Sequence, residues 1–122
     1  MGLRVAIVGS RDFLDRSLVE QFVIRLAARA PDTVIISGAA RGVDTWAAQT
    51  AKNLGLEVIE FPVTSEDWER YGNGAGRRRN TFIVEACDVV VAFWNGVSGG
   101  TMDTVRKARA AGKKVKVIEV RR

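Results

Sequence analysis

The sequence contains no histidine and only one cysteine, and these two absences exclude several kinds of site. Without histidine, the usual general base of enzymes and the commonest metal-binding side chain are both missing. Zinc sites are built from several cysteine and histidine ligands, so we expect neither a metal site nor a cofactor. The single Cys87 also excludes an internal disulfide and suits a reducing compartment. We therefore expect a cytoplasmic protein.

Long apolar segments and two familiar nucleotide motifs are also missing. The first apolar run, Leu3–Val8, is far too short for a signal peptide or a membrane span, so we expect no membrane partner. Residues 9–14, which follow this run, read Gly-Ser-Arg-Asp-Phe-Leu rather than G-x-G-x-x-G, and no Walker A motif occurs. These absences argue against an ordinary NAD-dependent dehydrogenase and against an ATPase.

Basic residues outnumber acidic ones, which leaves a formal net charge of +5 and a pI near 10.0. Nucleic acid is the obvious partner for such a protein. The excess of arginine alongside much alanine, glycine and valine can equally reflect a GC-rich gene, so we treat nucleic acid as the less favoured partner. The length of 122 residues fits one domain, residues 1–122, and such a domain can be stable without disulfides or a structural metal.

Short apolar runs alternate with longer amphipathic stretches along the whole chain. The pattern predicts strands at Leu3–Val8, Thr33–Ile36, Glu57–Phe61, Val89–Phe93 and Val115–Val120. It predicts helices at Leu14–Ala30, Val43–Leu54, Arg77–Ala86 and Thr101–Ala111, and a polar, turn-rich loop over 62–76. This alternation is typical of an α/β protein, here a single Rossmann-like, doubly wound, parallel five-stranded sheet of order 3-2-1-4-5 with helices on both faces. Ligands of such sheets bind beyond the carboxyl ends of the strands where the order reverses.

Residues 98–101 read Ser-Gly-Gly-Thr, between the predicted strand Val89–Phe93 and the helix that follows. Glycines let a ligand approach the backbone, and the first N–H groups of a helix have no partners within the helix. Together with the helix dipole, these N–H groups form an anion site, so we expect a phosphate-containing ligand. The alternative is an ordinary connecting loop capped by Thr101.

Two further glycine-rich or small-residue loops, 9–12 and 37–44, are predicted to reach the same edge of the sheet. Arg11 is a candidate to grip phosphate oxygens, because a guanidinium donates two parallel hydrogen bonds. It can instead pair with Asp12 or Asp15 at the surface. Asp44 can accept hydrogen bonds from ribose hydroxyls, or it can cap the helix that begins near Val43.

The segment 68–80 contains Trp68, Tyr71 and the run Arg77–Asn80. An aromatic side chain beside arginines can stack on a base and hold a phosphate. The alternative is a solvated, basic helix start without a ligand.

Together these motifs resemble the SLOG superfamily, in particular its YspA-like group; the superfamily also holds DprA and the LONELY GUY phosphoribohydrolases. The matching segments are Gly9–Arg11, Ser37–Ala39, Gly42–Asp44, Trp68, Tyr71–Gly72, Ala75–Gly76, Arg79–Asn80, Ala92–Trp94, Gly96 and Gly100–Thr101. The resemblance implies a Rossmann-like domain that binds a nucleotide-like small molecule and forms a homodimer or higher oligomer. Its implied ligand-binding residues, with those above, are Gly9, Ser10, Arg11, Ser37, Gly38, Asp44, Arg79, Asn80, Trp94, Gly96, Ser98, Gly99, Gly100 and Thr101.

The resemblance leaves the activity open. The related phosphoribohydrolases carry a glutamate three residues after the threonine of their glycine loop, and here that position is Thr104. Catalysis would then depend on Asp44 or Asp103, which are our candidate catalytic residues. We therefore favour a nucleotide-binding or sensing domain. The alternatives are a nucleotide N-glycosidase, or single-stranded DNA binding as in DprA through Arg77–Arg79 and the basic stretch Arg106–Arg122.

Overall fold

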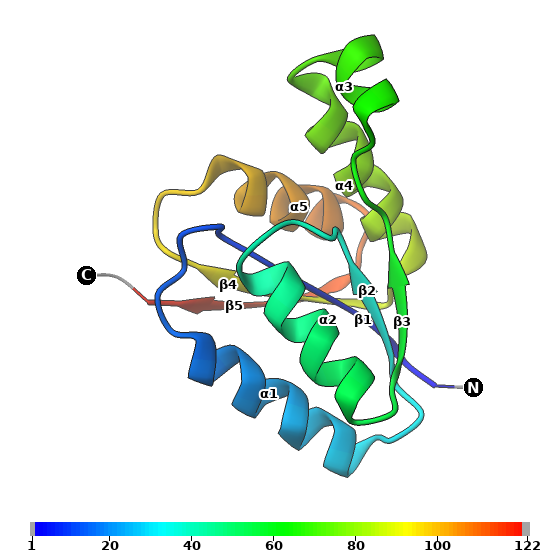
Figure 1. Ribbon diagram of the computed structural model, residues 1–122, viewed down its shortest axis with the longest axis vertical. Helices are drawn as coiled ribbons and strands as arrows, with labels where there is room; N and C mark the ends of the chain where they lie inside the picture. Colours follow the sequence, from blue (N-terminus) through cyan, green and yellow to red (C-terminus); the bar gives the residue numbers. More distant parts are fainter. Residues whose placement is uncertain (1, 121–122) are drawn as a thin grey trace.

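The computed structural model describes residues 2–120, and within them the chain forms one parallel sheet with helices on both sides (Figure 1). The strands are β1 Arg4–Gly9, β2 Val34–Ser37, β3 Glu57–Glu60, β4 Val89–Trp94 and β5 Lys114–Glu119. Their order across the sheet is β3-β2-β1-β4-β5, and every neighbouring pair is parallel. The predicted Rossmann-like fold and strand order are confirmed.

Each face of the sheet has its own pair of helices and its own apolar core. The helices α1 Arg16–Arg29 and α2 Val43–Asn53 cover one face, while α4 Gly74–Ala86 and α5 Gly99–Ala110 cover the other. Phe93 of β4 anchors the first core through edge-to-face contacts with Phe13 and Phe22, both at 5.7 Å between ring centroids. The central strands are thus buried on both sides, as their continuous apolar runs predict.

The order of the strands reverses between the two central strands, β1 and β4, which pair in register from Val5↔Val89 to Gly9↔Phe93. Both strands therefore end at the same edge of the sheet. The loop after β1 leads to α1 on one face, whereas the loop after β4 leads to α5 on the opposite face. The two loops diverge, and this divergence opens a crevice at the carboxyl edge.

The prediction of a loop over 62–76 was wrong. This segment holds the helix α3 Ser65–Tyr71 and the start of α4, which begins at Gly74 rather than at Arg77. A capping box starts α3: Thr64 Oγ1 accepts from Asp67 N, and Asp67 Oδ2 accepts from Thr64 N. The nearby glycines hid this signal. We call residues 65–78 the arm, because α3 and the first turns of α4 project away from the sheet, and α3 buries none of its side chains (Figure 1).

One helix start and the caps of two helices differ from their predictions, although the second helix begins at Val43 as predicted. The last helix begins at Gly99, two residues before its predicted start, and Ser98 rather than Thr101 is its N-cap. The second helix takes Gly42 as its N-cap, at a φ of 80°, so Asp44 lies in the first turn rather than at the cap. The freed Asp44 side chain instead serves the loop before the helix, as described below.

Candidate functional site

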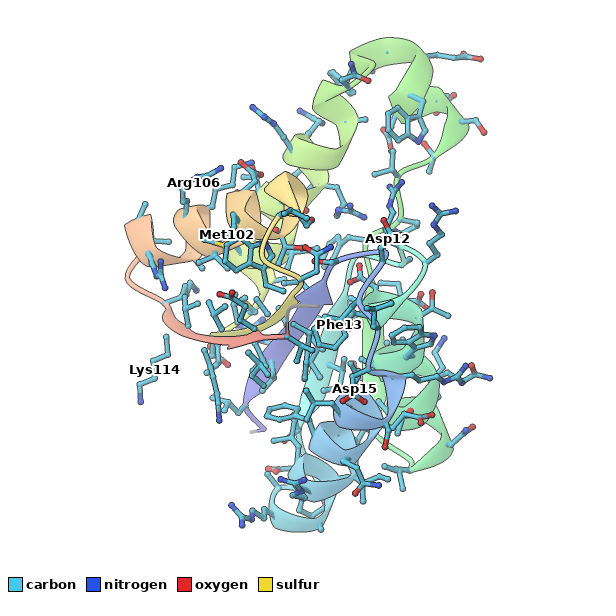
Figure 2. All side chains as sticks on the ribbon, turned by 90° about the vertical axis from the view of Figure 1, so that its left-hand side faces the viewer. Asp12, Phe13, Asp15, Met102, Arg106 and Lys114 are labelled. Atoms are coloured by element: carbon cyan, nitrogen blue, oxygen red, sulfur yellow. The ribbon has the colours of Figure 1, made fainter. Side chains whose placement is uncertain are left out.

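A cavity of about 440 Å³ occupies the crevice at the carboxyl edge, between the loops that follow β1, β2 and β4 and the first turns of α4. Its walls come from residues far apart in sequence: Val8, Gly9, Ser10, Arg11, Asp12, Ala40, Asp44, Asn73, Gly76, Arg77, Arg79, Asn80, Ile83, Asn95, Val97, Ser98, Gly100, Thr101 and Thr104. Figure 2 shows how one loop serves both core and cavity, because Phe13 turns in toward the sheet while its neighbour Asp12 lies at the edge.

The start of α5 forms one side of this cavity. Ser98 Oγ accepts from the Thr101 N–H at 3.4 Å, but within residues 2–120 the N–H groups of Gly99 and Gly100 have no acceptor. A Cβ added at either glycine would meet no described atom within 4 Å. Packing therefore does not require glycine at these two positions, whereas an anion approaching the free N–H groups would.

Hydrogen bonds fix the shape of the loop before α5. Asn95 Oδ1 accepts from the N–H groups of Val97 and Ser98, both at 3.0 Å, and the indole Nε1 of Trp94 donates to Ser98 O at 3.1 Å. The Asn95 N–H donates to Ser10 Oγ at 3.1 Å, which joins this loop to the one after β1. The start of α5 is therefore held in place before any ligand arrives.

Three arginines give the cavity its positive charge: Arg11, Arg77 and Arg79. Arg79 donates from Nη1 to Gly38 O and from Nε to Asn80 Oδ1, the latter at 3.0 Å. Burial lowers the pKa of the Arg79 guanidinium; the Asp44 carboxylate opposes this effect and the nearby Arg11 adds to it. Within the described residues, no ion pair joins Arg11 to Asp12 or Asp15. Three positive side chains around one cavity favour an anionic ligand.

Asp44 is the buried acid of the cavity, with only 5% of its surface exposed. Burial raises the pKa of this carboxyl to about 6, against the lowering effects of Arg79 and of hydrogen bonds from the N–H groups of Ala40, Gly9 and Gly38. The bond from Ala40 measures 3.3 Å. Asp44 thus draws together the loops that follow β1 and β2, and it is a carboxyl that can change its protonation state near neutral pH.

Not every predicted site residue lines the cavity. The predicted residues that are not among its lining residues are Ser37, Gly38, Trp94, Gly96 and Gly99. Ser37 Oγ supports the β2 loop by accepting from the Ala39 N–H at 3.1 Å. A Cβ on Gly38 would lie 2.7 Å from Asp44 Oδ2 and 2.9 Å from Arg79 Nη1, so this glycine makes room for both side chains.

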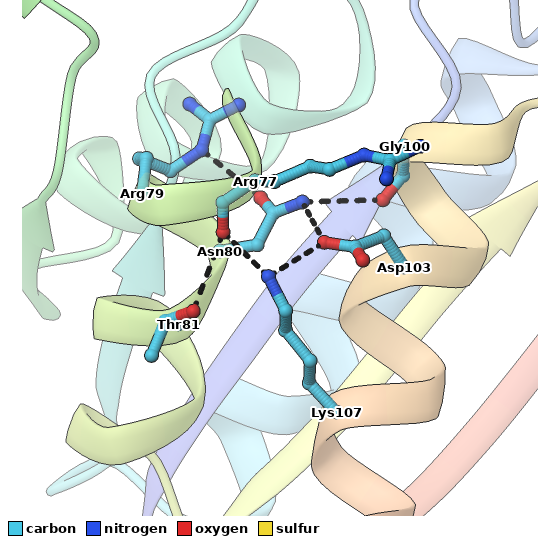
Figure 3. A network of polar contacts seen from close by, with 7 residues as sticks. All are labelled: Arg77, Arg79, Asn80, Thr81, Gly100, Asp103 and Lys107. Carbon is cyan, nitrogen blue, oxygen red and sulfur yellow. Dashed lines mark hydrogen bonds and ion pairs between the residues drawn. The ribbon is translucent and has the colours of Figure 1, made fainter. Parts of the chain in front are cut away.

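The other candidate acid, Asp103, is not among the cavity-lining residues, although its neighbour Thr104 is. Asp103 Oδ2 accepts from Lys107 Nζ at 2.9 Å and from Asn80 Nδ2 at 3.1 Å (Figure 3). Partial burial acts to raise the pKa of Asp103, but these two bonds and the nearby positive charge outweigh it, so the net shift is downward. The group is therefore a well-paired anion between α4 and α5.

Arg77 was predicted only as part of the run Arg77–Asn80, and several other lining residues were not predicted as ligand contacts: Val8, Asp12, Ala40, Asn73, Gly76, Ile83, Asn95, Val97 and Thr104. A signal existed for Asn95, because an asparagine just before a glycine is typical of a turn in which its side chain binds the backbone. For Asn73 and Gly76 no such signal existed, since their position depends on the arm, whose helices were not predicted.

The fold and the crevice at the strand reversal define a Rossmann-like domain. Residues 3–71 match the YspA, cpYpsA-related SLOG family, which is more than half of the chain. The chain therefore belongs to this family. No curated protein matches the sequence. Within residues 2–120, no helix is both long and apolar enough to span a bilayer.

Solved structures share the fold at low sequence identity. DNA processing protein A (DprA) from Streptococcus pneumoniae matches with a TM-score of 0.79 and 23% identity over 95% of this chain and 50% of its own. A Helicobacter pylori DprA, described for its single-stranded DNA binding mode, matches at 0.76 and 24% over 94% and 64%. A third structure, TM1055, matches at 0.71 and 21% over 93% and 72%. The chain thus spans between half and two thirds of the length of the two DprA chains.

Proposed function

We propose that residues 1–122 form a single binding or sensing domain for a nucleotide, or for a nucleotide-derived molecule that carries phosphate. The observation that supports this most is the open start of α5, with two free N–H groups beside a cavity that also contains Arg11, Arg77 and Arg79. Free N–H groups and guanidinium groups are the donors that bind phosphate oxygens best.

The remaining walls suit the rest of a nucleotide. Asp44 has lone pairs on its carboxylate that can accept from ribose hydroxyls, as its position near Arg79 and the β2 loop allows. Val97 at the rim is 81% exposed, and an apolar group of this kind at the mouth can contact the face of a base. We assign the phosphate to Ser98–Thr101 and Arg11, and the sugar to Asp44.

Native mass spectrometry of the purified protein and calorimetry with nucleoside 5′-monophosphates and inorganic phosphate test this proposal. We expect a co-purifying phosphate-containing molecule, or micromolar binding of at least one probe. The absence of both, in protein whose folding is verified by circular dichroism, would contradict the proposal.

A nucleotide N-glycosidase is the second candidate, and Asp44 is the observation that favours it. A carboxyl with a pKa of about 6 inside a polar cavity is typical of a general acid or base. Against this, Thr104 lines the cavity where the related hydrolases carry a glutamate, and a hydroxyl supplies no negative charge to a cationic sugar. Chromatography of free base released from nucleoside monophosphates decides: robust release by wild type that is lost in Asp44→Asn would identify an enzyme.

Single-stranded DNA binding is the third candidate, favoured by the arm. Trp68 and Tyr71 are exposed at 46% and 38%, and the Arg78 guanidinium lies 4.6 Å from the centroid of the Tyr71 ring. The predicted basic stretch Arg106–Arg122 ends in residues 121 and 122, which lie outside the described residues. Submicromolar binding of an oligonucleotide near physiological salt would exceed the usual non-specific range of roughly 10⁻⁴–10⁻⁶ M and would favour this candidate.

A further inference from the structure

The carboxamide of Asn80 joins the Arg79 guanidinium, which lines the cavity, to the start of α5, to which we assign the phosphate. It belongs to α4, is 6% exposed, and bonds to its own neighbour Arg79 on one side and to α5 on the other (Figure 3). Oδ1 accepts from Arg79 Nε at 3.0 Å. Nδ2 donates to Gly100 O at 3.3 Å and to Asp103 Oδ2 at 3.1 Å. Both amide hydrogens are therefore in use.

These bonds fix which way the amide faces. The opposite orientation would point the NH₂ group at a guanidinium N–H and the oxygen at a carbonyl and a carboxylate, which removes all three bonds. With its hydrogens engaged, Asn80 has only one lone pair left for a ligand, although its side chain lines the cavity. Most of the hydrogen-bonding capacity of the Asn80 side chain is thus used by its neighbours and not by a ligand in the cavity.

The bond to Arg79 restricts where that guanidinium points. Nε is tied to Asn80 and Nη1 to the carbonyl of Gly38, so two separate elements, α4 and the β2 loop, hold the same planar group. A guanidinium has five N–H hydrogens, and these bonds leave three for a ligand. Because the plane is fixed at two points, the remaining hydrogens are directed before the ligand binds.

The bonds to α5 act on the other anion-binding element. Gly100 O belongs to the first turn of α5, where Gly100 and Thr101 line the cavity. Asp103 lies one turn further along, and Lys107 binds both its carboxylate at 2.9 Å and the Arg77 carbonyl of α4 at 2.6 Å. The pair of Asp103 and Lys107 thus holds the side of α5 against the same turn of α4 that carries Asn80.

We propose that Asn80, anchored by Asp103 and Lys107, is a positioning residue that aligns the Arg79 guanidinium and the start of α5 on one anion. This inference rests on the proposed function, since the anion is the phosphate assigned above. It gives Asp103 a role through its oxygen as a hydrogen-bond acceptor and not through its charge at a reacting atom.

The first test needs no ligand. In ¹⁵N-labelled protein, the Arg79 Nε–H is expected to exchange with solvent more slowly than that of the exposed Arg78, and Arg79→Lys identifies its signal by removing it. Asn80→Ala should abolish this protection. Thr81→Ala is the matched control, because it removes the next side chain of α4, whose hydroxyl donates to Arg77 O and, within residues 2–120, to no other acceptor. Protection that persists in Asn80→Ala would overturn the inference.

The second test measures binding by calorimetry with inorganic phosphate and nucleoside 5′-monophosphates. We expect Asn80→Ala to weaken the best probe about tenfold, at the lower end for a charge-assisted hydrogen bond. On an Arg79→Lys background, which lacks the Nε–H partner, the same substitution should have a smaller effect. Full additivity of the two substitutions would contradict an action of Asn80 through Arg79.

The third test asks whether Asp103 acts as a hydrogen-bond acceptor for Asn80 or through its negative charge. Asp103→Asn keeps an oxygen for Asn80, so its affinity should stay within about twofold of wild type, whereas Asp103→Leu, of similar size, should weaken binding severalfold. Equal losses in both variants would show that charge matters, and would overturn the assignment. If no probe binds wild type, the proposed function fails, and the exchange of the Arg79 signal still decides whether Asn80 positions this side chain.

Discussion

The helices α2 and α5 begin at the same edge of the sheet, but the charges near their N-termini differ. In the first turn of α2, the buried Asp44 supplies a carboxylate that accepts from the surrounding N–H groups. The first turn of α5 contains no acidic residue, and its two glycines are exposed. A carboxylate from inside the protein thus lies at the positive end of α2, whereas the first turn of α5 has none; under the proposed function, a ligand supplies the negative charge there.

The comparison would break if Asp44 did not act as a buried anion, and Asp44→Asn tests this with the largest expected effect. The folded pKa of about 6 lies above the ordinary value of 3.8, so the folded state binds the proton more tightly than the unfolded chain. Raising the pH through this interval therefore lowers the free energy of unfolding, by up to about 3 kcal/mol between about pH 4 and pH 7. We expect denaturant unfolding of Asp44→Asn, measured across that pH range, to lack this pH-dependent part of the free energy of unfolding.

Asp12→Asn is the matched control, since Asp12 is an exposed carboxylate that lines the same cavity. It should leave the pH dependence of stability close to that of wild type. A slope in Asp44→Asn that equals the wild-type slope would show that the carboxyl at α2 is not held in the way described.

Gly100→Val sharpens the other side of the comparison by placing a branched side chain at the open start of α5. A Cβ at position 100 would meet no atom of another described element within 4 Å, so we expect the fold to persist, while the branched side chain blocks the approach of phosphate to the free N–H groups. We expect affinity for the best nucleotide probe to fall about a hundredfold, which corresponds to the loss of two charge-assisted bonds. Ala110→Val, at the exposed far end of α5, should bind normally in the same calorimetric titration.

Arg11 lies between the two helix starts: its backbone would contact a Cβ placed on Gly42, and its side chain lines the cavity. If α5 requires an external anion, Arg11→Ala should lower ligand affinity by roughly 1.5–3 kcal/mol, while the melting temperature without ligand barely changes. Arg41→Ala removes a nearby exposed arginine that does not line the cavity, and serves as the control. A collapse of stability without loss of affinity would make Arg11 a structural residue.

The smallest effect is expected for Ser98→Ala, which removes the side-chain cap of α5. The loss of the bond to the Thr101 N–H should reduce the free energy of unfolding by about 1 kcal/mol, as for other N-caps. The helix should remain in place, because Val105 and Ala108 are buried against the sheet. A change in thermal unfolding several times larger would indicate that the cap supports the whole loop, and not only the helix start.

The order of the strands and the edge at which the cavity opens could be predicted because both follow from local patterns. Apolar runs and amphipathic stretches identify strands and helices, and the handedness of parallel crossovers then restricts the topology. The glycines at the start of α5 were recognisable for a related reason, since a helix start after a buried strand is itself a local signal.

What could not be predicted depends on contacts between distant residues or on signals that other residues hid. The arm was missed because Gly72, Gly74 and Gly76 argue against a helix more strongly than the capping box of Thr64 argues for one. The placement of Asp103 against Asn80 follows from the packing of α4 on α5, which no spacing within one helix reveals. The role of Asp44 in joining the β1 and β2 loops likewise depends on how these loops are arranged in space, which the sequence pattern does not reveal.

The glycines at this edge are of two kinds, crowded and open, and we expect the two kinds to tolerate substitution differently. A Cβ on Gly9 would lie 2.6 Å from both Phe93 O and Val43 Cβ, so any larger residue there displaces the core itself. Gly99 and Gly100 face open space instead. If the start of α5 binds the proposed ligand, then in family members that have lost this ligand we expect selection to keep Gly9 unchanged while positions 99 and 100 drift. Substitution at those two positions would then mark the family members that no longer bind it.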